Sequence, residues 1–127
     1  NNMPYDLSFQ VRPDYVTAEL SVKIAPGQEL KEAMERWEAI ARICRENNRD
    51  KVLVVMSFNG SYGMETKFKL AKGASSIGWT PNLKLAVVIP DPDRFSEQLF
   101  TETALNSLGY EMKLFLKKRP AKKWLLG

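Results

Sequence analysis

Alternating apolar and polar residues predict two β-strands at the start of the chain. Segments 5–12 and 16–24 each place every second residue on an apolar face, which is typical of strands buried on one side only. Pro13 and Asp14 stand between them and favour a tight turn, because proline fixes φ and aspartate hydrogen-bonds to the nearby backbone. We therefore expect an antiparallel hairpin.

After the hairpin comes a segment whose apolar residues have helical spacing. Apolar residues from Leu30 to Cys44 recur every three or four positions, and Pro26 can start a helix without losing a hydrogen bond. This pattern predicts a helix that starts near Pro26 and ends at Asn47–Asn48. Glutamates dominate its first half and arginines its second half, an order that the helix dipole favours, so its charges need no ligand.

The rest of the chain continues the alternation of strands and helices. Two nearly continuous aliphatic runs predict strands that are covered on both faces. Asp91 followed by Pro92 is a helix start signal, and Gly109 is a helix stop signal. The predicted strands are 52–56, 83–89 and 110–116, and the predicted helices are 64–77 (with Met64, Phe68, Leu70 and Ala71 on its apolar side), 91–108 and 120–126.

Together these elements predict an α/β domain with a single-layer mixed sheet of five strands and about four helices. The first two strands form the antiparallel hairpin, and later β-α-β units add parallel strands through right-handed crossovers. No repeat or low-complexity linker divides the chain, so residues 3–127 are expected to form one domain. Asn1 and Asn2, which precede Met3, are interpreted as a cloning remnant.

The composition excludes several function classes. The 127 residues, 44% of them hydrophobic, are enough to bury a core without disulfides or metal. A lone Cys44 and the lack of an apolar run of roughly 18 residues favour a reducing compartment, by default the cytoplasm. The absence of histidine removes the usual general base, the usual triad member and the commonest zinc ligand. We therefore expect no enzymatic activity, no metal and no cofactor.

Two chemical alternatives have ordinary structural explanations. Cys44 lies on the apolar side of the first predicted helix, where a small buried side chain is more common than a reactive thiol. Asp91, Asp93 and Glu65 would lie beyond the carboxyl ends of central strands, where a divalent cation is conceivable. Because Asp91 and Asp93 are also good capping residues for the following helix, a metal site is the less favoured interpretation.

The loop that contains Gly60 and Gly63 is the first candidate binding site. Its glycines allow tight turns, and the N–H groups at the start of the following helix attract anions. We expect an unidentified protein partner to bind at this loop and at the next helix start; a solvated connection is the alternative. The predicted partner-binding residues are Ser61, Tyr62, Thr66 and Arg94.

Positive charge is concentrated at the C-terminal end, the second candidate site. The chain carries a net charge of +4, whereas residues 110–127 alone carry +5, so the rest sums to −1. Such a segment can bind an anionic membrane surface, and nucleic acid is less favoured because a wide basic face with interleaved aromatic residues is missing. Alternatively, Trp124 and Leu125 pack on the sheet edge while the lysines stay in water. The candidate surface-binding residues are Lys117, Lys118, Lys122, Lys123 and Trp124.

Large apolar residues also allow a ligand pocket. Trp37, Met34, Phe68, Trp79 and Phe95 could line one, although such residues at helical spacing are more often part of a core. The sequence does not identify a ligand for such a pocket.

Four stretches of the chain resemble the STAS-like superfamily, in particular its small stand-alone bacterial domains. They are MPYDLSF (3–9), RPDY (12–15), DPDRF (91–95) and FTETALNSLGYEMKLF (100–115). The superfamily includes the sporulation anti-anti-sigma factor and the cytoplasmic domains of sulphate transporters. The resemblance implies an anti-anti-sigma-like α/β fold and a regulatory or binding role.

One motif of that superfamily is missing here. Anti-anti-sigma factors resemble one another by an Asp-Ser pair at a helix start, and its place in this chain is taken by residues 63–66, which contain no such pair. Their phosphorylation switch is therefore not implied, and Ser61 and Thr66 are only weak substitutes. The favoured hypothesis is a non-catalytic regulatory domain that acts through protein–protein interaction, with homo-oligomerisation as a further option. The alternative is a lipid-surface or small apolar ligand-binding module.

Overall fold

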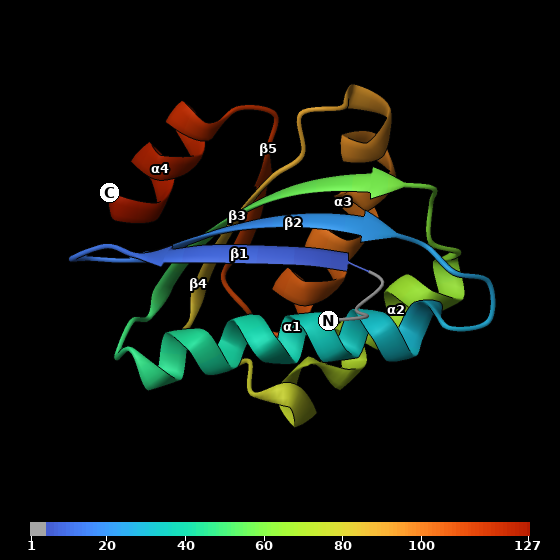
Figure 1. The fold of residues 1–127 in the computed structure, drawn as a ribbon, viewed down its shortest axis with the longest axis horizontal. Coiled ribbons are helices and arrows are strands. Elements are labelled where there is room, and N and C mark those ends of the chain that lie inside the picture. The colour runs from blue at the N-terminus through green and yellow to red at the C-terminus, as the bar shows by residue number, and fades with distance from the viewer. Residues whose placement is uncertain (1–4) are drawn as a thin grey trace.

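The predicted hairpin forms one edge of the sheet in the computed structural model, which describes residues 5–127 (Figure 1). Strand β1 (Tyr5–Val11) pairs antiparallel with β2 (Val16–Lys23). Every second residue of β2 is buried, which is the burial pattern that its alternating sequence predicts. The interpretation of Asn1, Asn2 and Met3 lies outside the described residues.

After β2, each strand lies parallel to the preceding strand and beside it, so the sheet order is β1-β2-β3-β4-β5. Each parallel connection passes through a helix, and right-handed crossovers in one constant direction put these helices on one face of the sheet. The last helix packs on the opposite face (Figure 1). The predicted α/β class, with five strands in one mixed sheet and four α-helices, is confirmed. The remaining elements are β3 (Lys51–Asn59), β4 (Lys84–Val88), β5 (Met112–Phe115), α1 (Glu29–Glu46), α2 (Met64–Gly73), the 3₁₀ helix η1 (Ala74–Ile77), α3 (Pro92–Ser107) and α4 (Lys118–Leu126).

The sheet carries an apolar core on each face. The larger core lies between the sheet and α1, η1 and α3, and it contains Val54 of β3, Val87 of β4 and Cys44 of α1. The smaller core lies under α4, where Leu125 packs with Leu53 of β3. Because successive residues of a strand point to opposite faces, β3 and β4 are buried on both sides, as their continuous aliphatic sequences predict.

Two helices begin elsewhere than predicted. Helix α1 begins at Glu29 rather than near Pro26, because the chain turns at Gly27, which adopts a φ of 82°. Helix α4 begins at Lys118, before Pro120. Proline is tolerated in a first turn because the N–H groups there have no acceptor within the helix.

The predicted helix after the β3 loop divides into α2 and η1, and part of its apolar side was wrongly predicted. Met64 and Phe68 are 59% and 49% exposed, whereas Lys67 is buried. Helix α2 has to cover the sheet and contact α3 at the same time. The ammonium of Lys67 donates to the backbone carbonyl of Glu97 on α3, which turns that side of α2 inward.

We predict that Leu125→Ala lowers the free energy of unfolding by about 3 kcal/mol, because it opens a cavity in the smaller core. Leu125 is fully buried, whereas its neighbour Leu126 is partly exposed. The matched control Leu126→Ala is expected to lower that free energy by less than about 1 kcal/mol. Urea denaturation of both variants measures the difference. Equal effects would show that α4 does not hold the sheet through Leu125.

Candidate functional site

An apolar cavity of about 70 Å³ lies between the sheet and the helices of the larger core, and it is partly open to solvent. Strand β4 contributes Leu85 and Val87 to its floor, and side chains of β3 and β5 extend that floor on either side. The helices contribute Trp37 of α1, Ala71 of α2 and Leu105 of α3. The cavity therefore has the apolar lining that is typical of small-molecule sites.

Short side chains on the covering helices explain why this space is not filled. Ala71 and Ala74, from α2 and η1, face the sheet with a single methyl group each. In α3, the one buried residue is Thr101, a small polar side chain that also lines the cavity. The α2–η1–α3 cover thus brings less side-chain volume to the sheet than a row of leucines would.

Of the residues that the sequence suggested for a pocket, Trp37 and Trp79 line the cavity. Their rings meet edge to face with centroids 5.8 Å apart, and the Trp79 indole N–H donates to the Trp37 carbonyl at 3.0 Å. Met34, Phe68 and Phe95 do not line it. Phe68 lies on the exposed side of α2, and Phe95 packs on the edge of the larger core.

Tyr62 is the principal polar residue of the cavity. Its side chain is only 7% exposed and lines the cavity, where its ring meets Phe58 edge to face at 6.0 Å and lies 5.5 Å below the Arg36 guanidinium. The Tyr62 hydroxyl is buried and has no hydrogen-bond partner among the described residues. Buried hydroxyls normally have a partner, and an unsatisfied one costs about 1–3 kcal/mol.

Two further polar side chains reach the cavity from α3. The Thr101 hydroxyl donates to Gln98 Oε1 at 3.1 Å, and both residues line the cavity. This bond leaves the Gln98 amide nitrogen as a donor that no other part of residues 5–127 uses. Tyr62, Thr101 and Gln98 thus offer hydrogen-bonding groups at the cavity, and Tyr110 and Glu111 are the other polar residues of a mainly apolar lining.

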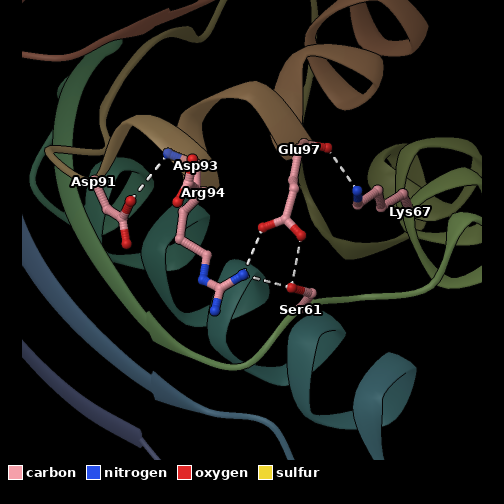
Figure 2. Close-up of polar contacts among 6 residues, drawn as sticks. All are labelled: Ser61, Lys67, Asp91, Asp93, Arg94 and Glu97. Carbon is pink, nitrogen blue, oxygen red and sulfur yellow. Dashed lines mark hydrogen bonds and ion pairs between the residues drawn. The ribbon is translucent and has the colours of Figure 1, made fainter.

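Ser61 and Arg94, two of the predicted partner-binding residues, meet each other in the structure (Figure 2). Arg94 Nη1 donates to Ser61 Oγ and to Glu97 Oε1, each at 2.7 Å, and the Ser61 hydroxyl donates to Glu97 Oε2 at 2.7 Å. We call this three-residue cluster the clasp. With the bond from Lys67 to the Glu97 carbonyl, it ties the β3–α2 loop and α2 to α3.

Of the four predicted partner-binding residues, Tyr62 is buried and does not lie on the surface. The hydrogen-bonding groups of Ser61 and Arg94 contact each other and Glu97, while Tyr62 lies inside the cavity and Thr66 in the first turn of α2. Sequence reasoning missed Glu97, although its spacing of three residues from Arg94 on a helix is a signal for an ion pair.

The clasp also connects to the cavity through the chain itself. Ser61 precedes Tyr62, and Glu97 precedes Gln98, so two clasp residues are each bonded to a residue that lines the cavity. The hydrogen bonds from Arg94 and Ser61 lower the pKa of the Glu97 carboxyl group. The clasp is therefore held by a charged carboxylate.

The other chemical candidates have structural roles. The Asp91 carboxylate accepts the Asp93 N–H at 2.9 Å and caps α3 as predicted, and Glu65 pairs with Lys69 at 2.8 Å. Burial raises the pKa of the Cys44 thiol to about 11, so this thiol is protonated at neutral pH. Within residues 5–127, no group of three or more cysteine, aspartate or glutamate side chains could hold a metal ion.

The C-terminal segment packs on the face of the sheet rather than on its edge. Trp124 contacts the Phe115 ring at 5.8 Å, and the Lys84 ammonium lies 4.6 Å above the Trp124 ring and donates to its carbonyl at 2.9 Å. The apolar side of α4 is thus used in the smaller core. Of the candidate surface-binding residues, Lys117, Lys118, Lys122 and Lys123 are exposed, whereas Trp124 is partly buried.

A scan against protein-family models finds no match to this chain, and a search of curated proteins finds no significantly similar sequence. Among the helices of the described chain, none combines the length and the apolar character needed to span a membrane.

We predict that Glu97→Gln weakens the fold near neutral pH and that this effect fades in acid. Because the pKa of Glu97 is lowered in the folded protein, its charge stabilises the fold above the unfolded pKa, and this contribution is lost as pH falls. Urea denaturation of the Glu97→Gln variant and of the unsubstituted protein between about pH 6 and about pH 3 measures the difference in their free energies of unfolding.

Glu38→Gln, which removes the same charge from an exposed position on α1, is the control for this experiment. Its free energy of unfolding is expected to differ little from that of the unsubstituted protein at every pH. A Glu97→Gln effect that does not change with pH would contradict a clasp held by the carboxylate charge.

Proposed function

We propose that this domain is a non-catalytic binding module whose cavity takes a small aliphatic ligand with one neutral oxygen, such as an alcohol or a carbonyl compound. The observation that carries the proposal is the buried Tyr62 hydroxyl, which lines an apolar cavity and has no partner among the described residues. A ligand oxygen would supply the missing hydrogen bond, while its hydrocarbon part would fill the apolar space.

The shape of the cavity favours a chain over a ring. An engineered cavity of about 150 Å³ holds benzene, and the volume here is about 70 Å³, so a ligand of that size has to extend through the open side of the cavity. The lining follows β4 from Leu83 to Ile89, a distance of about 20 Å at the usual rise per strand residue. A narrow hydrocarbon chain laid along β4 therefore fits better than an aromatic ligand.

The hydrogen-bonding groups of Tyr62 and Gln98 favour a neutral oxygen. The Tyr62 hydroxyl can donate or accept a hydrogen bond, and the Gln98 amide nitrogen donates one. An alcohol or carbonyl oxygen can accept a hydrogen bond from either group. A carboxylate would have to leave water for an apolar lining, which is unfavourable unless it is paired with a charge.

The STAS-like resemblance of the sequence supports a binding role of this kind in a regulatory domain. The protein interaction predicted at Ser61 and Arg94 stays compatible with it, because the clasp adjoins Tyr62 in the chain. Under this proposal, a partner would bind at the clasp and would sense whether the cavity is occupied. The observations favour the ligand as the primary function, since the clasp groups already bond to one another.

We predict that Tyr62→Phe has opposite effects on stability and on binding. Removal of the unpaired hydroxyl should raise the free energy of unfolding of the unliganded protein by about 1 kcal/mol. The same change should weaken the binding of 1-hexanol about tenfold, because the ligand loses its hydrogen bond. Urea denaturation and NMR titration of methyl signals with 1-hexanol measure the two effects.

Two controls accompany the Tyr62→Phe experiment. Tyr15→Phe removes a hydroxyl beside the smaller core, on the other face of the sheet, and should change neither quantity in this way. Cyclohexanol, a ring with the same functional group, should bind more weakly than 1-hexanol. Unchanged 1-hexanol affinity in Tyr62→Phe would rule out the hydroxyl as the ligand's anchor, and no binding of 1-hexanol at all would overturn the proposal.

We further predict that Ala74→Leu stabilises the unliganded protein by about 1 kcal/mol and abolishes 1-hexanol binding, because the larger side chain fills the cavity. The control Ala121→Leu adds the same atoms on the other face of the sheet, where Ala121 is fully buried. Overpacking there should destabilise the fold by about 1–3 kcal/mol. Loss of stability in Ala74→Leu would indicate that the cavity cannot accept added hydrocarbon.

A further inference from the structure

The outer edge of β1 presents hydrogen-bonding groups of the backbone. Across the hairpin turn, the Arg12 N–H donates to the Tyr15 carbonyl at 2.8 Å. Hydrogen-bonded and non-hydrogen-bonded pairs alternate along an antiparallel ladder, so the N–H and C=O groups of Gln10 and Ser8 point toward β2. Those of Phe9, halfway along the strand, therefore point outward, and the same alternation applies to Leu7 and Val11.

This edge lacks the features that usually prevent strand pairing. Natural edge strands are kept short, charged with lysine, interrupted by proline or bent by a bulge. Strand β1 has seven residues, contains neither lysine nor proline, and pairs one-to-one with β2 without a bulge. Its Phe9 and Val11 side chains are 48% and 39% exposed.

The opposite edge of the same sheet does carry such protection. Strand β5 has four residues, one of which is Lys113, and Lys117 and Lys118 follow shortly after it. The two edges of one sheet thus differ in the way expected if the β1 edge has a partner and the β5 edge has none.

The sequence of β1 is complementary to itself in the antiparallel direction. If a two-fold axis passes beside Phe9, Phe9 of one copy lies opposite Phe9 of the second copy, as an outward-facing hydrogen-bonded pair. Leu7 then lies opposite Val11, and the register position of Asp6 lies opposite that of Arg12. Aromatic side chains thus meet each other, and aliphatic side chains meet each other, at directly opposed positions, where each such pair is favourable.

We propose that β1 pairs antiparallel with β1 of a second copy of this chain, so that a homodimer forms around one continuous sheet. A two-fold axis makes the contact isologous, which closes the assembly at two copies and leaves no free β1 edge. The contact uses the backbone of β1, and it does not depend on the cavity or on the clasp.

Sedimentation equilibrium of the full chain at micromolar concentration tests the dimer. The unsubstituted protein should sediment as a dimer, and Phe9→Pro should sediment as a monomer. Proline at this position removes a donor that points outward while the ladder to β2 keeps its bonds. A monomeric unsubstituted protein would overturn the proposal, and so would a dimer that survives Phe9→Pro.

A charge exchange keeps the test decisive if Phe9→Pro fails to fold. In the proposed register, Ser8 of one copy lies opposite Gln10 of the other, twice in the dimer. Ser8→Lys combined with Gln10→Lys should raise the dimer dissociation constant about tenfold, because like charges then lie opposite each other. Ser8→Lys combined with Gln10→Glu should leave that constant near its original value. Glu19→Lys, a charge change on the exposed side of β2, is the control and should have little effect. Equal dissociation constants for the two double variants would overturn the proposed register.

Discussion

Each strand is added to the sheet beside the one before it and always on the same side, and the other features of the structure depend on this constraint. Because every connection after β2 leads to the next strand on the same side, α1, α2 and α3 have to share one face. Only α4, the last element, covers the other face, where Leu125 fills the smaller core. One face of the sheet is therefore covered by three helical connections, and the α2–η1 connection brings two alanines to the place where the cavity lies.

Under the proposed function, the Tyr62 side chain in that cavity would connect the stability of the fold to ligand binding. Its ring is held by Phe58 and by the Arg36 guanidinium, so the hydroxyl cannot turn to water without breaking these contacts. An unpaired buried hydroxyl destabilises a fold that is stable by only a few kcal/mol. Groups of this kind, which lower stability and are matched by a ligand, are expected at functional sites and not in the rest of a core.

The elements were predictable from the sequence because their signals are local. Alternation marks β1 and β2, continuous aliphatic residues mark β3 and β4, and the Asp91 cap marks the start of α3. The inward side of α2 was not predictable, since it depends on how Lys67 reaches the backbone of α3. The positions of the cavity and the clasp were not predictable either, because both arise where segments far apart in the chain meet; of the suggested pocket residues, only Trp37 and Trp79 line the cavity. Only the contact of Arg94 with Glu97 carries a sequence signal, a helical spacing of three.

The cavity, the clasp and the β1 edge lie in different parts of the domain, and this separation affects how they can interact. The cavity floor follows β4, the clasp ties the loop after β3 to α3, and the β1 edge is separated from β4 by β2 and β3. Sites this far apart without shared contacts are usually additive in free energy. The cavity and the clasp, in contrast, share the 61–62 and 97–98 peptide bonds. Any coupling between ligand binding and the surface is therefore expected at the clasp, and dimer formation at β1 should leave ligand affinity unchanged.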